Sequence, residues 1–383
     1  MGKFSFNIIA NGVWGPEGLS GGDNIFINFS KILQKLGHEV NVYTWEDGFE
    51  LCQSHGLKDV NFNLWPVRKF KFLGFAGLYL LRTLKGCFEV LRMKKPPKKK
   101  LFFYSASDFW PDSIPGFLMS RRLKAKWIAG FYLFAPNPLS GVRNFFYWFT
   151  QKPIFWLISK YADLICVTSE PDGEPFVKAG RKQEDTFVVK GGIDYQHLKE
   201  LQKPAKKIYD AVFVGRFHPQ KGVLEMIDVW KTVTDKLPGA KLAVIGVGPL
   251  ENKMKEKVEK YGLMKNIDFL GPLIGDEKNK ILQQAKIFLH PVIYDSGGMA
   301  PADGLACGLP GVCFDLPVFK SYYSQGFMRA QTGNTKIFAQ KIIELLNDKM
   351  LYQKLSDEAI LEARTWDWQN RVESFLAKVK DLW

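Results

Sequence analysis

The sequence lacks any long uninterrupted apolar segment. No run of roughly 18 uncharged apolar residues, the length that a membrane-spanning helix needs, occurs among its 383 residues. Its N-terminal residues predict a β-strand directly and show no pattern of a signal peptide. We therefore expect a cytoplasmic protein without a membrane span.

Cysteine and histidine are both scarce. The five cysteines are scattered, odd in number and without the spacing of metal ligands, which argues against a disulfide framework or a zinc site. We expect them to be reduced, with Cys307 and Cys313 serving in packing. No pair of carboxylates has the arrangement of a magnesium site, so the sequence implies no metal and no cofactor.

Acidic residues are fewer than basic ones. Lys and Arg number 53 against 39 Asp and Glu, which leaves a net charge of +14. A surplus of this size suggests an anionic partner, such as a phosphate ligand, nucleic acid or lipid headgroups. Most of it lies in Pro66–Lys100, which holds eleven Lys and Arg residues and a single acid, Glu89.

An amphipathic helix is predicted inside this basic segment. Between Gly74 and Met93 the charged residues fall on one helical face and leucines fill much of the rest; the charged residues are Arg82, Lys85, Glu89 and Arg92. Such a helix is typical of a protein that lies on an anionic membrane surface. A domain helix with a solvated rim is the alternative.

A second unusual segment, residues 145–158, is rich in aromatic residues on both sides of Pro153. Aromatic side chains of this kind occur at the interface depth of a bilayer, or line the pocket of an apolar substrate. Buried domain core is the alternative explanation.

The length and the order of predicted elements indicate two domains. A chain of 383 residues is too long for one compact core, and strands alternate with helices in both halves, which predicts doubly wound parallel sheets. We expect an α/β protein with Rossmann-like domains at 1–195 and 196–365, facing each other across a cleft. The helix 366–383 is expected to pack back on the first domain, and the polar stretch Glu200–Lys207 suits a linker.

Glycine-rich turns follow several predicted strands. Asn11–Gly22 lacks the GxGxxG pattern but precedes a helix for which Asp23 is a suitable N-cap; a turn that only needs a flexible backbone is the alternative. In Val214–Gly222, Arg216 and Lys221 flank a strand-to-helix turn, an arrangement that suits a diphosphate. They could instead be ordinary surface residues.

The run from His290 to Pro310 contains a strand end, a glycine loop and a short helix. Asp295 lies on the loop and Asp303 about two turns later, so both could face one site. The backbone amides of the loop would make a cradle for a phosphate leaving group; they belong to Ser296, Gly297, Gly298 and Met299.

Taken in order, these motifs resemble glycosyltransferase family 4, the retaining enzymes of the GT-B fold. The resemblance covers most of the chain, and its matching segments are 12–22, 36–40, 191–194, 214–222, 244–249, 269–271 and 306–310. It implies transfer of a sugar from a nucleotide diphosphate sugar, UDP- or GDP-linked, to an acceptor with retained anomeric configuration. The first domain would then bind the acceptor and the second the donor.

The resemblance also implies roles for single residues. Arg216 and Lys221 match the diphosphate-binding pair, Asp303 matches the acid that holds the ribose, and Asp295 matches the acid near the donor sugar. We therefore expect Asp295, Arg216 and Lys221 to be catalytic. The remaining donor-binding positions are Gly22, Gly215, Gly246, Leu270, Ser296, Gly297, Gly298 and Met299.

The sequence departs from the family pattern at the acids. Both family glutamates are aspartates here, shorter by one carbon–carbon bond of about 1.5 Å, and Ser296 replaces a glycine. Ser107 and Asp108 stand where many members have a histidine, which makes Asp108 a candidate on the acceptor side. Front-side departure of the diphosphate, stabilised by the two cations, requires no protein base.

The leading hypothesis is a glycosyltransferase on the cytosolic face of a membrane, held there through Pro66–Lys100 and the aromatic segment and acting on a lipid-linked acceptor. A GT-B phosphorylase or epimerase-like enzyme, a non-catalytic sugar-nucleotide-binding subunit and a basic nucleic-acid-binding protein are the alternatives. No recognition module for nucleic acid is apparent, so we expect no nucleic-acid partner.

Overall fold

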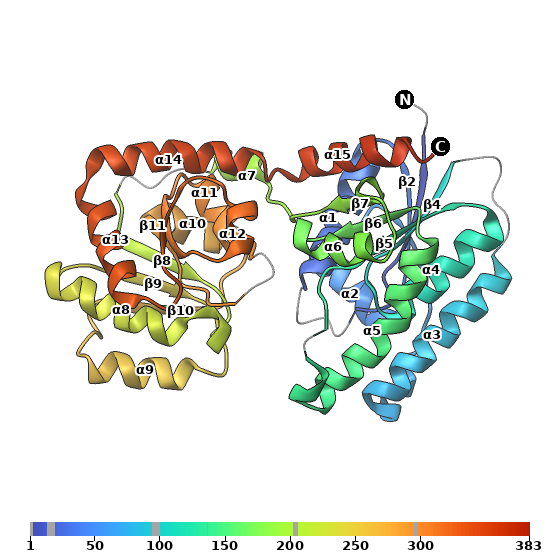
Figure 1. Cartoon of the computed structure of the whole chain (residues 1–383), viewed down its shortest axis with the longest axis horizontal. Coiled ribbons are helices and arrows are strands. Elements are labelled where there is room, and N and C mark those ends of the chain that lie inside the picture. Colours follow the sequence, from blue (N-terminus) through green and yellow to red (C-terminus); the bar gives the residue numbers. More distant parts are fainter. Residues whose placement is uncertain (1–2, 14–19, 94–99, 136, 202–205, 295–297) are drawn as a thin grey trace. The chain divides into compact units, whose positions relative to one another are not determined.

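The computed structural model describes residues 3–13, 20–93, 100–135, 137–201, 206–294 and 298–383. The chain forms two compact units, Met1–Gly191 with Trp368–Trp383, and Gly192–Asp367 (Figure 1). The expected linker Glu200–Lys207 falls inside the second unit. Its first residue, Glu200, is the last residue of a helix. No helix of the described residues is both long and apolar enough to cross a membrane.

The first unit is built on a seven-stranded, wholly parallel sheet in the order β3-β2-β1-β4-β5-β6-β7. Its strands are β1 Ser5–Ile9, β2 Glu39–Thr44, β3 Asn61–Leu64, β4 Leu101–Ser105, β5 Lys126–Gly130, β6 Leu164–Val167 and β7 Thr186–Val188. Its helices are α1 Gly21–Lys35, α2 Glu46–Ser54, α3 Gly74–Arg92, α4 Trp110–Leu123, α5 Val142–Tyr161, α6 Glu170–Lys178 and α15 Trp368–Lys380, with short 3-10 turns η1 Arg68–Leu73, η2 Pro138–Ser140 and η3 Gln183–Asp185.

Alternating side chains of the strands enter two cores, one on each face of this sheet. Phe102 and Tyr104 of β4 join the core that α1 and α15 cover, whereas Phe103 joins the core on the other face. Phe375 of α15 packs against Phe6 with ring centroids 6.1 Å apart. The C-terminal helix therefore belongs to the core of the first unit.

The second unit holds a six-stranded, wholly parallel sheet in the order β10-β9-β8-β11-β12-β13. Its strands are β8 Tyr209–Val214, β9 Leu242–Ile245, β10 Ile267–Gly271, β11 Ala285–His290, β12 Gly311–Phe314 and β13 Phe327–Ala330. Its helices are α7 Tyr195–Glu200, α8 Val223–Lys236, α9 Glu251–Lys260, α10 Gly275–Gln284, α11 Ala300–Ala306, α12 Pro317–Tyr322, α13 Thr335–Asn347 and α14 Lys349–Arg364, with the turn η4 Pro219–Lys221.

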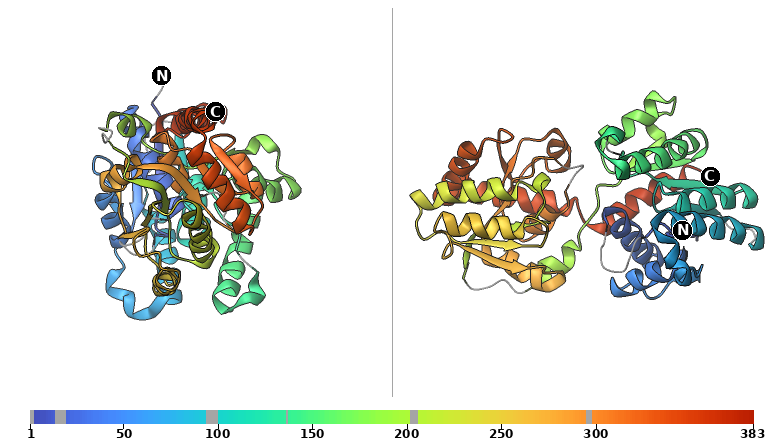
Figure 2. Two further views of the ribbon diagram at one scale, coloured as in Figure 1. Left: turned by 90° about the vertical axis from the view of Figure 1, so that its left-hand side faces the viewer. Right: turned by 90° about the horizontal axis from the view of Figure 1, so that it is seen from below.

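Here too the strands are buried on both faces. Leu242 and Val244 of β9 pack into one core, and Ala243 and Ile245 pack into the other; helices lie on both sides of the strands in the two further views (Figure 2). The predicted fold class, two Rossmann-like α/β domains with doubly wound parallel sheets, is confirmed.

One expectation about local structure is wrong. Ser20, and not Asp23, is the N-cap of α1: the Ser20 hydroxyl accepts from the Asp23 amide and the Asp23 carboxylate accepts from the Ser20 amide, each at 3.1 Å. This reciprocal pair is a capping box, so Gly22 lies in the first turn of the helix. The residues around Pro153 form a single helix, α5, which continues through the proline.

Backbone segments approach closely where the strands of the second sheet end. Gly222, before α8, has a φ of +64°, and a Cβ there would lie 1.8 Å from the Pro291 carbonyl oxygen. Gly246, after β9, has a φ of +144°, and its Cβ would lie 1.9 Å from the Gly215 carbonyl oxygen. Only glycine fits at these positions, so the turns after β8, β9 and β11 pack main chain against main chain.

Replacing Gly222 by alanine should therefore destabilise the second unit strongly. We expect a loss of at least about 3 kcal/mol, because the strain of a positive φ adds to a clash with backbone that cannot rotate away. Gly262→Ala is the matched control, since Gly262 has a φ of +69° and open space around it; its cost should be only about 1 to 2 kcal/mol. Urea unfolding of both variants measures the difference, and equal losses would contradict the close packing.

Candidate functional site

The two predicted cations lie at the carboxyl edge of the second sheet. β8 pairs with β9 on one side and β11 on the other, so the segments that follow these strands leave the sheet at one edge. Arg216 follows β8 with an exposed side chain, and Lys221, partly buried, ends the η4 turn just before α8. Lys221 therefore lies directly before the N-terminus of a 14-residue helix, and Arg216 lies on the segment that leads to it.

Main-chain hydrogen bonds hold this segment from both sides. The amide of Phe217 donates to the Val247 carbonyl at 2.9 Å, and the amide of Ile293 donates to the Gln220 carbonyl at 2.9 Å. The first bond connects the Arg216 turn to the turn after β9, and the second connects the η4 turn to the segment after β11. The backbone that carries the two cations is thus positioned by its neighbours.

The structure brings three further predicted donor-binding positions to the same edge. Gly215 donates its amide to the Ile245 carbonyl at 3.0 Å, and Gly246 donates to the Gly271 carbonyl at 2.9 Å. Leu270 precedes Gly271 at the end of β10 and is partly buried. These positions follow or end the adjacent strands β8, β9 and β10, so their backbones form one continuous rim.

Asp303, in helix α11, is not a free carboxylate. Its Oδ2 atom lies 2.5 Å from Nζ of Lys278 in α10, and the two side chains are only 22% and 21% exposed. An ionised carboxylate has about four acceptor positions, so Asp303 can still accept hydrogen bonds from hydroxyl groups. No sequence signal points to this partner, because Lys278 is one of two lysines on a polar helix.

The end of the loop before α11 is anchored by a tyrosine. The hydroxyl of Tyr323 donates to the Gly298 carbonyl at 2.5 Å, and its ring stacks on Trp366 with centroids 4.8 Å apart. Gly298 and Met299 are thereby placed directly before the helix that carries Asp303. The predicted site residues Asp295, Ser296 and Gly297 lie outside the described residues.

A second polar cluster lies at the carboxyl edge of the first sheet, between β1 and β4. The strand order reverses at this point, which is where α/β sheets commonly bind ligands. Asp112, in the first turn of α4, accepts from the Gly12 amide at 2.6 Å and from the Ser107 hydroxyl at 2.5 Å. Burial raises the pKa of Asp112 to about 7.

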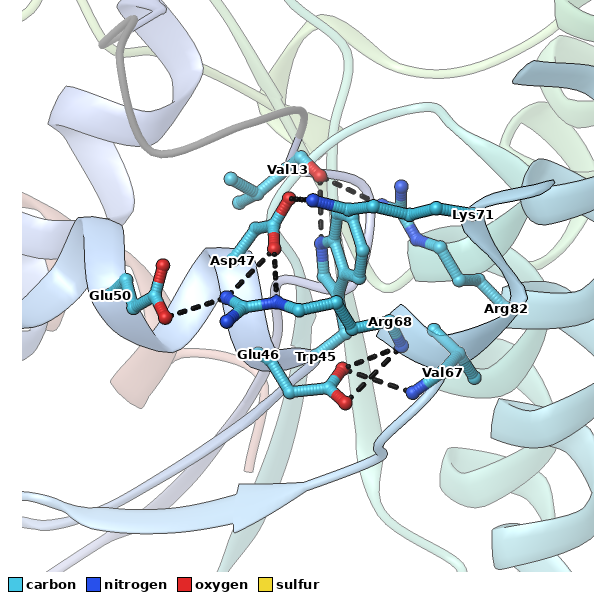
Figure 3. A network of polar contacts seen from close by, with 9 residues as sticks. All are labelled: Val13, Trp45, Glu46, Asp47, Glu50, Val67, Arg68, Lys71 and Arg82. Carbon is cyan, nitrogen blue, oxygen red and sulfur yellow. Dashed lines mark hydrogen bonds and ion pairs between the residues drawn. The ribbon is translucent and has the colours of Figure 1, made fainter. Parts of the chain in front are cut away.

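The turn after β1 is also held by Arg82 and Trp45 (Figure 3). The Arg82 guanidinium donates to the carbonyls of Asn11 and Val13, the second at 3.0 Å, and Trp45 Nε1 donates to the same Val13 carbonyl at 2.8 Å. Helices α3 and α4 and the start of α2 thus clamp the first residues of the glycine segment. Sequence reasoning did not single out Trp45 as functional, and it placed Arg82 on the solvent face of a helix.

Arg82 corrects the predicted charged face of α3. The side chain is fully buried and stacks over Trp45, with its guanidinium carbon 4.5 Å from the ring centroid. The turn after β1 supplies carbonyl acceptors that attract this cation inward, whereas the periodicity of the helix alone assigns it to the solvent. Arg68 and Lys71 are also engaged, since each lies 2.9 Å from a carboxylate oxygen of buried Asp47 (Figure 3).

Asp108, the acceptor-side candidate, follows β4 at the same edge and is partly buried. Its Oδ2 atom accepts from Nε2 of Gln151 in α5 at 2.8 Å, and Oε1 of Gln151 accepts from the Ala135 amide at 2.7 Å. Burial raises the pKa of Asp108 to about 6. Gly22 lies near this edge as well, and a Cβ on it would be 3.0 Å from the Tyr132 ring.

The described part of the chain contains no group of three or more His, Cys, Asp or Glu side chains that could hold a metal ion. The polar groups at the two sheet edges are instead cations, main-chain amides and single carboxylates. This chemistry suits a phosphate-bearing ligand with hydroxyl groups.

Residues 195–362 match the family model described as Glycosyl transferases group 1. An uncharacterized glycosyltransferase of Methanocaldococcus jannaschii is 25% identical over 340 residues, which cover 80% of this chain and 81% of the relative. A sulfoquinovosyl transferase of Arabidopsis thaliana is 24% identical over 380 residues, covering 92% of this chain and 68% of the relative.

Among solved structures, the Anabaena protein HepE in complex with UDP and glucose has a similar fold. Its TM-score is 0.73 at 14% sequence identity, and the alignment covers 99% of this chain and 100% of that one. The second unit thus contains a glycosyl transferases group 1 domain, the fold is GT-B, and the chain is a glycosyltransferase.

Buried Asp112 makes the stability of the first unit depend on pH. Its pKa is about 7 in the folded chain and about 3.9 when unfolded, so the folded state binds more protons between these values. Stability should then fall as pH rises from about 4 to about 7, by at most about 1.4 kcal/mol per pH unit. Asp112→Asn removes this contribution. The variant should therefore fall furthest below the wild type in free energy of unfolding at low pH.

Urea unfolding across this pH range tests the prediction, with hydrogen exchange of peptides from β1 and β4 as the probe of the first unit. Asp59→Asn, a change at an exposed acid of the same unit, provides the baseline. A stability difference between wild type and Asp112→Asn that stays constant with pH would contradict the assignment.

Proposed function

We propose that this glycosyltransferase moves a sugar from a UDP- or GDP-linked donor to an acceptor with retention of the anomeric configuration. The observation that carries the proposal is the pair Arg216 and Lys221, held by main-chain bonds at the carboxyl edge of the second sheet. Two cations beside the N-terminus of α8 suit the diphosphate of such a donor.

In this proposal the donor lies along the rim of the second sheet. Arg216 and Lys221 contact the phosphate oxygens, and the Gly215 and Gly246 turns let the donor approach the backbone closely. Asp303 accepts hydrogen bonds from the ribose hydroxyls while Lys278 holds its other side. The backbone amides of Ser296, Gly297, Gly298 and Met299 are expected to bind the phosphates, and Asp295 in the same loop is expected to lie near the donor sugar.

The proposed reaction breaks the bond between the anomeric carbon and the diphosphate oxygen. The acceptor oxygen forms its new bond to the same face of the sugar, and its proton passes to the departing phosphate oxygen. Negative charge develops on the diphosphate during this step, and the Arg216 and Lys221 cations stabilise it. The step therefore uses neither a protein base nor a metal ion.

The similarity to HepE, whose structure holds UDP and glucose, supports a nucleotide sugar as the donor. The resemblance to sulfoquinovosyl transferase supports transfer of a sugar group. For the acceptor, we propose a lipid-linked molecule at the cytosolic face of a membrane, with Asp108 beside its reacting hydroxyl. A carboxylate with a pKa near 6 would be largely ionised at neutral pH and would accept a hydrogen bond from that hydroxyl.

Replacing Lys221 by alanine should lower turnover by about 100-fold or more, because one cation at the developing charge is lost. The variant should stay folded, since its main-chain bonds remain. Turnover is measured as release of nucleoside diphosphate from a panel of UDP- and GDP-sugars, and EDTA should leave the wild-type rate unchanged.

Lys253→Ala is the matched control, because Lys253 is an exposed lysine of α9 in the same unit. Wild-type turnover in Lys221→Ala would remove Lys221 from the site. Loss of wild-type turnover in EDTA, restored by a divalent cation, would contradict the metal-free step.

A further inference from the structure

Exposed apolar side chains gather on two helices of the first unit. Among the described residues, seven Phe and Trp side chains are exposed, and six of them lie on η1, α3 or α5. Phe72 is 79% exposed, Leu84 66% and Phe149 57%. A concentration of this kind is rare on a protein surface unless that surface meets a partner.

The exposed side chains follow helical spacing. Along α3 they include Leu80, Leu84 and Leu91, and along α5 they include Val142, Phe145, Phe149 and Trp156. Steps of three, four and seven residues place side chains on one stripe of a helix. Each helix therefore presents an apolar stripe to the solvent, in addition to the face that it buries in the unit.

Contacts between aromatic rings join the two helices into one surface. Phe75 of α3 lies 5.5 Å from Phe146 of α5, and Tyr79 lies 5.8 Å from the same ring. Figure 1 shows the first turns of α3 and α5 at the lower end of this unit. We call the exposed apolar residues of η1, α3, η2 and α5 the α3–α5 surface.

Cations outnumber acids around the α3–α5 surface, and the acids beside it are already paired: Asp47 binds Arg68 and Lys71 of η1. Residues 138–161 contain no Asp or Glu, and Glu89, the one acid of η1 and α3, pairs with Lys85 at 2.7 Å. Lys152 lies 4.9 Å from the Trp148 ring and Lys160 lies 5.0 Å from the Trp156 ring. Cations of this kind keep the charged group at the polar boundary while the stem covers apolar surface.

We propose that the α3–α5 surface docks this enzyme on an anionic lipid bilayer, with its apolar stripes in the interfacial region and its cations among the headgroups. Helices with an apolar face, aromatic residues and flanking lysines lie in the plane of such an interface. The proposal deepens the proposed function, on which its link to the acceptor rests, because it supplies the membrane that a lipid-linked acceptor requires.

The charges favour a bilayer over a second copy of the chain. In a two-fold dimer the same patch meets itself, so the lysines around the stripes would face lysines of the partner, while the nearby acids Glu50 and Glu89 already pair with Arg68 and Lys85. Like charges placed opposite each other weaken such an interface. Anionic headgroups, in contrast, are attracted to each exposed Lys and Arg.

Helix α5 connects the surface to the acceptor-side residues. Phe149 is exposed on it, and Gln151, two residues later, donates to Asp108 at 2.8 Å. Between them, the Thr150 carbonyl accepts from Nε1 of Trp110 at 2.7 Å. Phe149 and Gln151 lie on nearly opposite sides of one turn of α5, so a bilayer that contacts Phe149 is separated from the contact to Asp108 by about one helix diameter, roughly 10 Å.

Vesicle flotation tests the proposal on the full chain. We expect the wild type to float with phosphatidylcholine vesicles that contain phosphatidylglycerol, and to float less with pure phosphatidylcholine. The triple variant Phe72→Ser, Leu84→Ser and Phe149→Ser should lose vesicle affinity by about tenfold or more, since it removes three large apolar side chains from the contact. Val142→Ser, at a residue 89% exposed, provides a single-site variant with a smaller loss in the same direction.

The matched control is Met264→Ser, Ile274→Ser and Met350→Ser, three apolar residues of the second unit that are 66%, 80% and 86% exposed, and it should float as the wild type does. Release of nucleoside diphosphate from a soluble donor should be unchanged in both triple variants, so failure of docking is distinguishable from failure of the donor site. Absence of wild-type flotation, or equal flotation of all proteins, overturns the proposal. Light scattering that shows a wild-type dimer and a monomeric Phe72, Leu84 and Phe149 variant would assign the surface to a second copy instead.

Discussion

The parallel pairing of β8 between β9 and β11 is the constraint on which the donor side of this enzyme depends. Val214 pairs with Ile245 on one side, and Val212 pairs with Phe288 on the other. Because the strands are parallel, their following segments all leave at one edge, where Gly222 and Gly246 let main chain meet main chain. The positions of the Arg216 and Lys221 main chains thus follow from backbone packing.

In the first unit, side chains hold the segment that follows β1. Its segment after β1 is held by the Arg82 guanidinium, the Trp45 indole and the Asp112 carboxylate, which come from different helices or their starts. Burying a cation and a carboxylate costs free energy unless both are well hydrogen-bonded. Such a cost is reasonable if the turn has to keep one conformation for a ligand.

Much of the fold could be predicted from the sequence, because it depends on local patterns. Buried strands that alternate with amphipathic helices specify two parallel sheets, and the turns around Arg216 and Gly246 follow strands in an order that the family resemblance also contains. The remaining features depend on contacts between residues far apart in the chain. Arg82 has the spacing of a surface residue and is buried by carbonyls 69 and 71 residues away, and Lys278 pairs with Asp303 across 25 residues. The cap of α1 is a local error instead, because Ser20 and Asp23 are neighbours in the chain and both residue types are suitable N-caps.

The central claim is that the carboxyl edge of the second sheet binds the diphosphate of a sugar nucleotide. The most direct test is a crystal structure of the full chain soaked with UDP or GDP. The account predicts phosphate oxygens within hydrogen-bond distance of Arg216 and Lys221, with the ribose beside Asp303. Density for the nucleotide elsewhere on the molecule, with these three side chains unoccupied, would contradict it.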